Sequence, residues 1–401
     1  MWSAVTAQPP HATRWLASSM IRITHVINNL QVGGAELSLM RLLERVDRSR
    51  FSPSVISLIG EGTVGPRLRD LDIPVVALGA ERGRISPRIL AALRRELRRA
   101  SPQLIQSWMY HSNLAAHLVR GSVPGKPPIA WNIRHSLHEL RHEKWLTRLV
   151  IKSGARRSRR AEAVVFNSRV SMRQHEAIGF RSPRNLVIPN GVDLDLFRPV
   201  AGAREELRRS LGLAPEALLV GGVGRFHPMK DHRMLARAVA IASDEGQDLH
   251  CVIAGRGYEV ESDTRALRSA SGLGDRLHLL PESTSIESIY SGLDLFAVSS
   301  RWGEGFPNVL AEAMACSVPS LSTDVGDAPS ILDDPRRIVP PGDAEAMARA
   351  IEHVIGLDAE SRRSLGRRDR DRIHQHYRME DVTERYQGLW SQLVSERTCG
   401  S

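Results

Sequence analysis

The sequence predicts an α/β protein made of two Rossmann-like domains, each a parallel sheet with helices on both faces. Short runs rich in β-branched residues alternate with helical patterns along nearly all of the 401 residues, which is typical of parallel sheets. That length suits two domains. Charge is divided in the same way: residues 1–200 hold 31 Lys and Arg against 14 Asp and Glu, whereas residues 201–401 hold 24 against 31.

The first domain is predicted over residues 20–197. Residues 1–19 lack the apolar core of a signal peptide, so we expect a disordered tail, or an early start ahead of Met20. A stretch with Pro199 and Gly202, between residues 193 and 203, is typical of a linker. Helical patterns such as 35–46 fill the gaps between strands. The strands are expected at 21–28, 54–59, 74–78, 103–108, 129–134, 163–167 and 185–189.

The second domain is predicted over residues 198–378. Its strands are expected at 218–223, 249–254, 276–280, 293–299, 318–322 and 337–339, with helices such as 229–242 between them. A last amphipathic stretch, 379–394, follows the final strand and is free to dock elsewhere.

Composition excludes several classes of protein. The chain has three cysteines, an odd number without metal-like spacing, which favours a reducing compartment such as the cytoplasm. No apolar run reaches the ~18 residues of a membrane span. The basic first half favours an anionic partner. Nucleic acid is a poor candidate, because aromatic residues are only 5% of the chain and form no stacking platform within the basic half.

The most informative segment holds two glutamates, Glu304 and Glu312, around a predicted helix start at Gly305, Phe306, Pro307 and Asn308. Unpaired amides at a helix N-terminus bind anions. Two carboxylates beside such a site could accept hydrogen bonds from hydroxyl groups, so the segment predicts a sugar-nucleotide site. The alternative is a pair of surface charges that complement the helix dipole.

Two further segments follow predicted first strands. Gly33 and Gly34 form a glycine turn that would let the backbone approach a diphosphate, or a simple tight turn. It is not the G-x-G-x-x-G fingerprint of nicotinamide enzymes. Arg225 and Lys230 could neutralise a diphosphate leaving group without a metal, or be ordinary surface charges.

Three other features each allow a functional and a structural interpretation. His111 follows a strand and could contact a sugar hydroxyl, or simply bond to backbone at a helix start. The stretch from Leu140 to Arg160 combines an apolar stripe with a basic rim, which suits an anionic membrane surface or a solvated charged face. Asp193 and Asp195 have D-x-D spacing, but they lie in the predicted linker and indicate a turn rather than a metal site.

Together these segments resemble the retaining family-4 (group 1) glycosyltransferases of the GT-B fold, similar to enzymes of bacterial surface polysaccharides. The resemblance covers residues 21–394. It rests on four motifs in order: the segment 33–36 (GGAE), the segment 188–193 (IPNGVD), the segment 223–225 (VGR) with Lys230, and the glutamate pair around 305–307 (GFP).

The resemblance implies a nucleotide-sugar donor, held mainly by the second domain in a central cleft, and a glycan or lipid-linked acceptor. Glu312 would bind the ribose, Arg225 and Lys230 the diphosphate, and Glu304 the donor sugar. The amides of Gly34, of Phe306 and of the neighbours of Pro307 would complete the anion site, and His111 would lie near the reacting centre. A last helix, 379–395, would cross back to the first domain.

The first domain offers no clear carboxylate nucleophile, so we expect same-face attack, with the leaving phosphate as base and no metal or other cofactor. A GT-B sugar-nucleotide epimerase and a non-catalytic membrane-associated subunit remain alternatives. We expect a cytoplasmic protein, either soluble or peripheral on the inner face of the cytoplasmic membrane.

Overall fold

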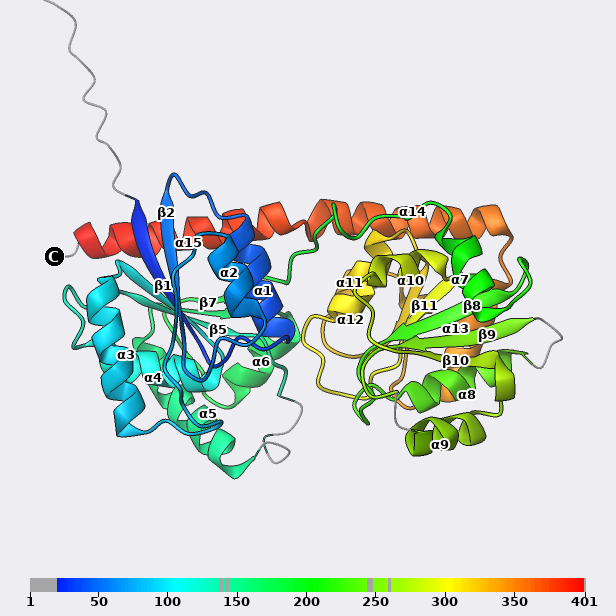
Figure 1. The fold of residues 1–401 in the computed structure, drawn as a ribbon, viewed down its shortest axis with the longest axis horizontal. Helices are drawn as coiled ribbons and strands as arrows, with labels where there is room; N and C mark the ends of the chain where they lie inside the picture. Colours follow the sequence, from blue (N-terminus) through cyan, green and yellow to red (C-terminus); the bar gives the residue numbers. More distant parts are fainter. Residues whose placement is uncertain (1–19, 138–139, 141–143, 244–247, 259–260, 400–401) are drawn as a thin grey trace, which may run out of the picture.

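The computed structural model describes residues 20–137, 140, 144–243, 248–258 and 261–399. The expected tail, residues 1–19, lies outside this range. The described residues form two α/β lobes side by side, with a pair of long C-terminal helices running across both (Figure 1). All thirteen predicted strands have a counterpart, which confirms the two Rossmann-like domains.

In the described residues, the first domain contains a seven-stranded parallel sheet of order β3-β2-β1-β4-β5-β6-β7. One face packs against α1, α2 and α15, and the other against α3 to α6. Strands covered on both faces are nearly continuous apolar runs, as parallel sheets require. The elements are β1 (Ile21–Ile27), α1 (Gly34–Glu44), β2 (Phe51–Ser57), α2 (Val64–Asp70), β3 (Val75–Ala77), α3 (Pro87–Ala100), β4 (Leu104–Trp108), α4 (Tyr110–Arg120), β5 (Ile129–Ile133), α5 (Trp145–Arg157), η2 (Ser158–Arg160), β6 (Ala163–Phe166), α6 (Arg169–Ala177) and β7 (Asn185–Val187).

The described part of the second half contains a six-stranded parallel sheet of order β10-β9-β8-β11-β12-β13. Its two faces bury separate apolar clusters. The elements are α7 (Ala203–Leu211), β8 (Leu218–Val223), α8 (His232–Ala242), β9 (Leu249–Ala254), α9 (Glu261–Ser271), η4 (Gly274–Arg276), β10 (Leu277–Leu280), α10 (Ile286–Gly292), β11 (Leu295–Val298), α11 (Asn308–Ala315), β12 (Ser320–Thr323), α12 (Ala328–Leu332), η5 (Pro335–Arg337), β13 (Ile338–Val339), α13 (Ala344–Ile355), α14 (Ala359–His376) and α15 (Met379–Cys399).

One strand begins earlier than the pattern indicated. The expected strand starts at Ser54, but β2 starts at Phe51 and includes Pro53. Pro53 pairs with Ile23 of β1, whereas pairing with β3 begins only at Val55. The missing N–H of Pro53 therefore has no β3 partner to lose, which is where a strand tolerates proline.

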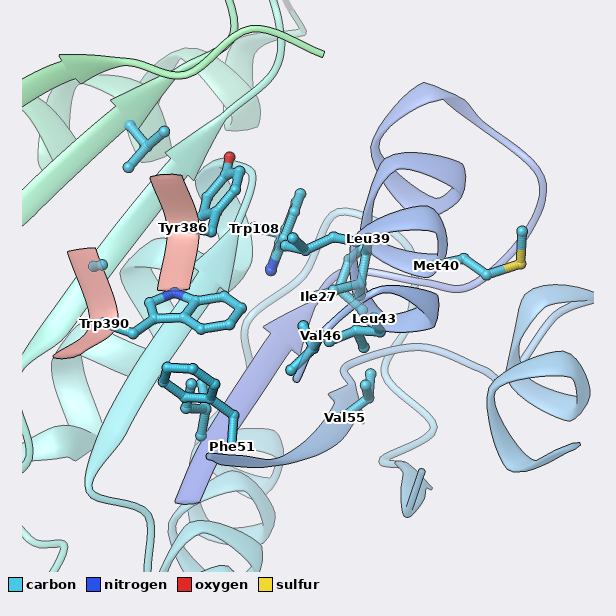
Figure 2. Close-up of a cluster of buried hydrophobic side chains, with 14 of the residues drawn as sticks. Ile27, Leu39, Met40, Leu43, Val46, Phe51, Val55, Trp108, Tyr386 and Trp390 are labelled. Carbon is cyan, nitrogen blue, oxygen red and sulfur yellow. The ribbon is translucent and has the colours of Figure 1, made fainter. Parts of the chain in front are cut away.

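The C-terminal helix α15 belongs to the core of the first domain. Its Tyr386 and Trp390 are buried against Trp108 and Phe51 (Figure 2). The indole N–H of Trp390 also donates to the Gln106 side-chain oxygen at 3.1 Å. The chain thus leaves the first domain once and returns to it after completing the second.

The outgoing and returning segments cross at Gly191. The amide of Val192 donates to the carbonyl of Tyr377 at 2.7 Å, and the amide of Met379 donates to the carbonyl of Val192 at 3.0 Å. A Cβ on Gly191 would lie 2.5 Å from Met379 Sδ and 2.7 Å from Met379 Cα. Only glycine fits this crossing without displacement of the returning backbone.

Gly191→Ala should therefore lower the free energy of unfolding by about 1–3 kcal/mol, the usual cost of overpacking. Gly388→Ala is the matched control, because Gly388 is exposed in α15 and a Cβ there meets nothing within 4 Å. That variant should be stabilised by about 0.5–1 kcal/mol through helix propensity. Urea denaturation of both variants measures the difference, and equal midpoints would show that the crossing is not tight.

Candidate active site at the domain interface

Lys230 and Glu304 form a partly buried ion pair on two loops at the carboxyl ends of β8 and β11. The ammonium Nζ lies 2.6 Å from Glu304 Oε1, and the Ser300 hydroxyl donates to the same oxygen at 2.7 Å. Burial alone would raise the pKa of Glu304, but Lys230 and Ser300 outweigh it and hold that pKa below its usual range. Glu304 is therefore a charged acceptor beside a cation.

The second glutamate lies on α11, whose first residue is Asn308. One oxygen of Glu312 accepts from the Tyr290 hydroxyl at 3.2 Å, and the other lies 3.3 Å from Arg41 Nη1. Arg41 is in the last turn of α1, so this ion pair joins the two domains. The predicted helix is present, and Pro307 is its N-cap.

A chain of polar contacts reaches the start of α11 from the first domain. The Asn190 amide donates to Asn308 Oδ1 at 2.5 Å, and the Arg134 guanidinium donates to Asn190. Arg134 also donates to the Tyr386 hydroxyl at 3.1 Å and lies over the Trp108 ring. The first turn of α11 is thus held in place against the first domain.

The glycine turn faces the same helix start. A Cβ on Gly34 would come within 4.0 Å of Asn308 Nδ2, so this backbone approaches α11 directly. A Cβ on Gly33 would lie 2.5 Å from Glu36 Oε2, and Glu36 in turn accepts from Asn29 at 3.1 Å. A Cβ at position 33 would therefore displace the end of the flexible Glu36 side chain rather than the backbone.

The second domain also contacts the first around α6. A Cβ on Gly305 would lie 2.9 Å from Asn167 Oδ1, so the Gly305 backbone packs closely against the Asn167 side chain. The carboxylate of Asp327 accepts from the amides of Arg169 and Val170 at 2.8 and 3.1 Å, at the N-terminus of α6. The aromatic ring of Phe306 is buried and packs on Tyr377, so its amide rather than its ring is the group available to a ligand.

Arg225 and His111 lie apart from these pairs. Arg225 is exposed on the loop after β8, near enough to Glu304 to favour its charged form. His111 is half-buried in the first turn of α4, and burial lowers the pKa of its imidazole. Within the described chain, its Nε2 is buried without a hydrogen-bond partner.

The sequence therefore pointed to the two clusters around Glu304 and Glu312, and it missed several of their partners. Ser300 was not singled out, and nothing in its spacing marks it. Arg41 lies in the last turn of α1, the helix that follows the predicted glycine turn. The missed partners are Arg41, Arg134, Asn190, Tyr290 and Ser300.

The remaining sequence predictions concern metal binding, a membrane span and the basic stretch. The residues described here contain no group of three metal-ligating side chains. Asp193 instead forms an ion pair with Arg45 at 2.7 Å and accepts turn amides. No helix in the described ranges is long and apolar enough to cross a bilayer. The predicted basic stretch lies partly outside the described residues, and its described part is α5 with η2.

Two family models match the chain in succession. One, Glycosyltransferase Family 4, covers residues 32–196, and the other, Glycosyl transferases group 1, covers residues 203–372. Together they span both domains and the four motifs quoted from the sequence. The chain belongs to the group 1 glycosyltransferases.

Individual relatives of this glycosyltransferase match over shorter stretches. The D-inositol 3-phosphate glycosyltransferase of Actinosynnema mirum is 35% identical over 185 residues, which is 43% of this chain and 44% of the relative. The lipopolysaccharide core biosynthesis mannosyltransferase LpsB of Rhizobium meliloti is 31% identical over 195 residues, 48% of this chain and 51% of the relative. The chain thus matches about half the length of these curated relatives.

Solved structures match over nearly the whole glycosyltransferase chain. HepE of Anabaena, solved with UDP, superposes with a TM-score of 0.81 at 20% identity, covering 93% of this chain and 100% of that one. Sucrose-phosphate synthase of Thermosynechococcus elongatus gives a TM-score of 0.75 at 20% identity, covering 94% and 100%. At these identities the likeness establishes the fold, which is GT-B.

Proposed function

We propose that this glycosyltransferase moves a sugar from a nucleotide-sugar donor, a UDP-sugar, to a hydroxyl of a glycan or lipid-linked acceptor, with retention of anomeric configuration. The observation that carries the proposal is the partly buried Lys230–Glu304 pair beside the start of α11. It places a cation, a carboxylate that can accept hydrogen bonds from sugar hydroxyls, and the backbone amides at the start of a helix close together. Structures of HepE with UDP and with UDP-glucose support the choice of donor.

The chemistry follows from the charge that develops on the departing group. As the bond between the anomeric carbon and the diphosphate breaks, negative charge grows on the phosphate oxygen. The Lys230 ammonium has three N–H donors, so it can keep its hydrogen bond to Glu304 and still donate to that phosphate oxygen. Arg225 and the start of α11 add to this stabilisation.

The acceptor hydroxyl would attack from the face that the diphosphate leaves. Its oxygen forms the new bond to the anomeric carbon, and its proton passes to the departing phosphate. Glu304 would orient the donor sugar through its hydroxyls, and Glu312 would hold the ribose. His111 would lie on the acceptor side of the reaction. We place the reaction in the cytoplasm, or at the inner face of the cytoplasmic membrane.

A panel of UDP-, GDP- and ADP-sugars tests the proposal by thermal shift, followed by a transfer assay with a lipid-linked glycan. UDP-sugars should stabilise the protein most, because only the bound nucleotide shifts the folding equilibrium. Incubation with the donor alone separates the rival function. Rapid epimerisation of the donor would make the protein an epimerase, and absence of any nucleotide binding would favour a non-catalytic subunit.

Removal of metal ions gives a further expected result. Because cationic side chains and backbone amides would stabilise the leaving group, turnover should be undiminished after treatment with EDTA. The measurement is the initial rate before and after chelation, with Mg²⁺ added back as the control. A rate that collapses with EDTA and returns with Mg²⁺ would contradict the proposed mechanism.

A further inference from the structure

A cavity of about 620 Å³ opens at the carboxyl edge of the first sheet, and it is lined by residues of the first domain. Asn28, which follows β1, and His111, which begins α4, are half-buried parts of its wall. Arg82, Lys144 and Trp145 also line it and are exposed. The cavity therefore leads from the surface to the histidine that the proposed reaction places on the acceptor side.

An exposed apolar patch adjoins the opening of this cavity. Trp145, Leu146 and Leu149 are 62%, 37% and 54% exposed, and all three lie in the first turns of α5. Further along the same helix, Ile151 is buried, so α5 has a core face and this separate outward patch. Contiguous exposed apolar side chains rimmed by polar groups mark an interaction site. Trp145 and Leu146 belong both to the cavity wall and to the patch.

Positive charge is in excess around the opening of the cavity. Arg84 is neutralised by Glu81 at 3.0 Å. Arg82 and Lys144 have no ion pair among the described residues, and Lys152 is exposed further along α5. Exposed cations beside a tryptophan and two leucines complement a lipid with an anionic head. A neutral soluble glycan would use neither the cations nor the apolar patch.

We propose that the cavity binds the acceptor and that this acceptor is a lipid with a phosphate in its polar head. Arg82 and Lys144 hold the phosphate, and Trp145, Leu146 and Leu149 contact the apolar chain. The sugar hydroxyl that attacks the donor then points toward His111. This inference rests on the proposed function, because it specifies the acceptor for the same reaction.

Co-sedimentation of the full chain with vesicles tests the proposal. The vesicles contain phosphatidylcholine alone, phosphatidylcholine with phosphatidylglycerol, or phosphatidylcholine with undecaprenyl phosphate, and inorganic phosphate serves as a competitor. Binding should be strongest with undecaprenyl phosphate. It should weaken at least about tenfold in Arg82→Glu/Lys144→Glu, on the scale of losing two charges near an anionic surface. Trp145→Ser/Leu149→Ser should weaken it similarly.

Matched controls lie at the opposite edge of the sheet. The control variants are Lys126→Glu and Leu71→Ser. Lys126 lies just before β5 and Leu71 lies before β3, and both side chains are exposed. These variants should bind the vesicles as wild type does. Equal binding by the cavity variants and these controls would overturn the proposal, as would equal binding to phosphatidylcholine alone. Complete displacement by inorganic phosphate would show a phosphate site without a lipid role.

The UDP thermal shift separates this inference from the proposed function. Every variant should retain the shift, which also verifies folding. Retained UDP binding with vesicle binding that ignores Arg82, Lys144 and Trp145 would overturn only the lipid acceptor. Absence of UDP binding in the wild type would instead overturn the proposed function.

Discussion

Replacing Lys230 with alanine is expected to lower kcat by about 100-fold or more. The Lys230 ammonium would stand beside the charge that develops on the leaving diphosphate, and losing one such group typically costs that much. Arg301→Ala is the matched control. Arg301 is an exposed cation that pairs with Asp231 at 3.0 Å on a neighbouring loop, so its loss should leave kcat within a few-fold. Steady-state rates with a UDP-sugar measure both.

A structural explanation for the loss can be separated from a catalytic one. Lys230→Ala leaves the partly buried carboxylate of Glu304 without its cation, which is destabilising in itself. The double variant Lys230→Ala/Glu304→Gln removes that unpaired charge and should recover thermal stability, but not turnover. Activity within threefold of wild type in Lys230→Ala would show that Lys230 does not stabilise the leaving group.

Glu312→Gln is expected to weaken UDP binding by about 10–100-fold. Hydrogen bonds to a charged group are worth about 1.5–3 kcal/mol, and the amide offers the ribose hydroxyls a weaker acceptor. Isothermal titration with UDP measures the effect. The glutamine keeps the size of the side chain, so the core around Tyr290 and α11 should be preserved.

Two neighbours of Glu312 act as controls. Tyr290→Phe removes one hydroxyl that donates to Glu312 at 3.2 Å but keeps the carboxylate, so the loss should be much smaller. Arg41→Ala removes the interdomain ion pair and leaves the carboxylate available, so UDP affinity should stay within about threefold. Unchanged affinity in Glu312→Gln would remove this glutamate from the donor site.

The fold followed from the sequence because its signals are local. The alternation of apolar runs with helical patterns depends on burial of each strand between two helical layers, which every segment shows in its own composition. Pro53 shows where local signals are not enough. A strand tolerates proline where the missing N–H faces no neighbouring strand, and only the order and register of the sheet show where that is.

The site was only partly predictable for a related physical reason. Glu304, Glu312 and Lys230 lie in motifs with local spacing. Arg41 meets Glu312 across 271 positions of sequence, and Asn190 meets Asn308 across 118. Such pairs depend on how the two domains face each other, and the packing at the Gly191 crossing contributes to that arrangement. No single segment carries that information.

The central claim is transfer of a sugar from a UDP-sugar with retention at this interface. The most direct test is proton NMR of the anomeric centre in the product formed from a UDP-α-sugar and a lipid-linked acceptor. We expect acceptor-dependent release of UDP and an α-linked product, both abolished in Lys230→Ala. A β-linked product, or UDP release that does not depend on the acceptor, would contradict it.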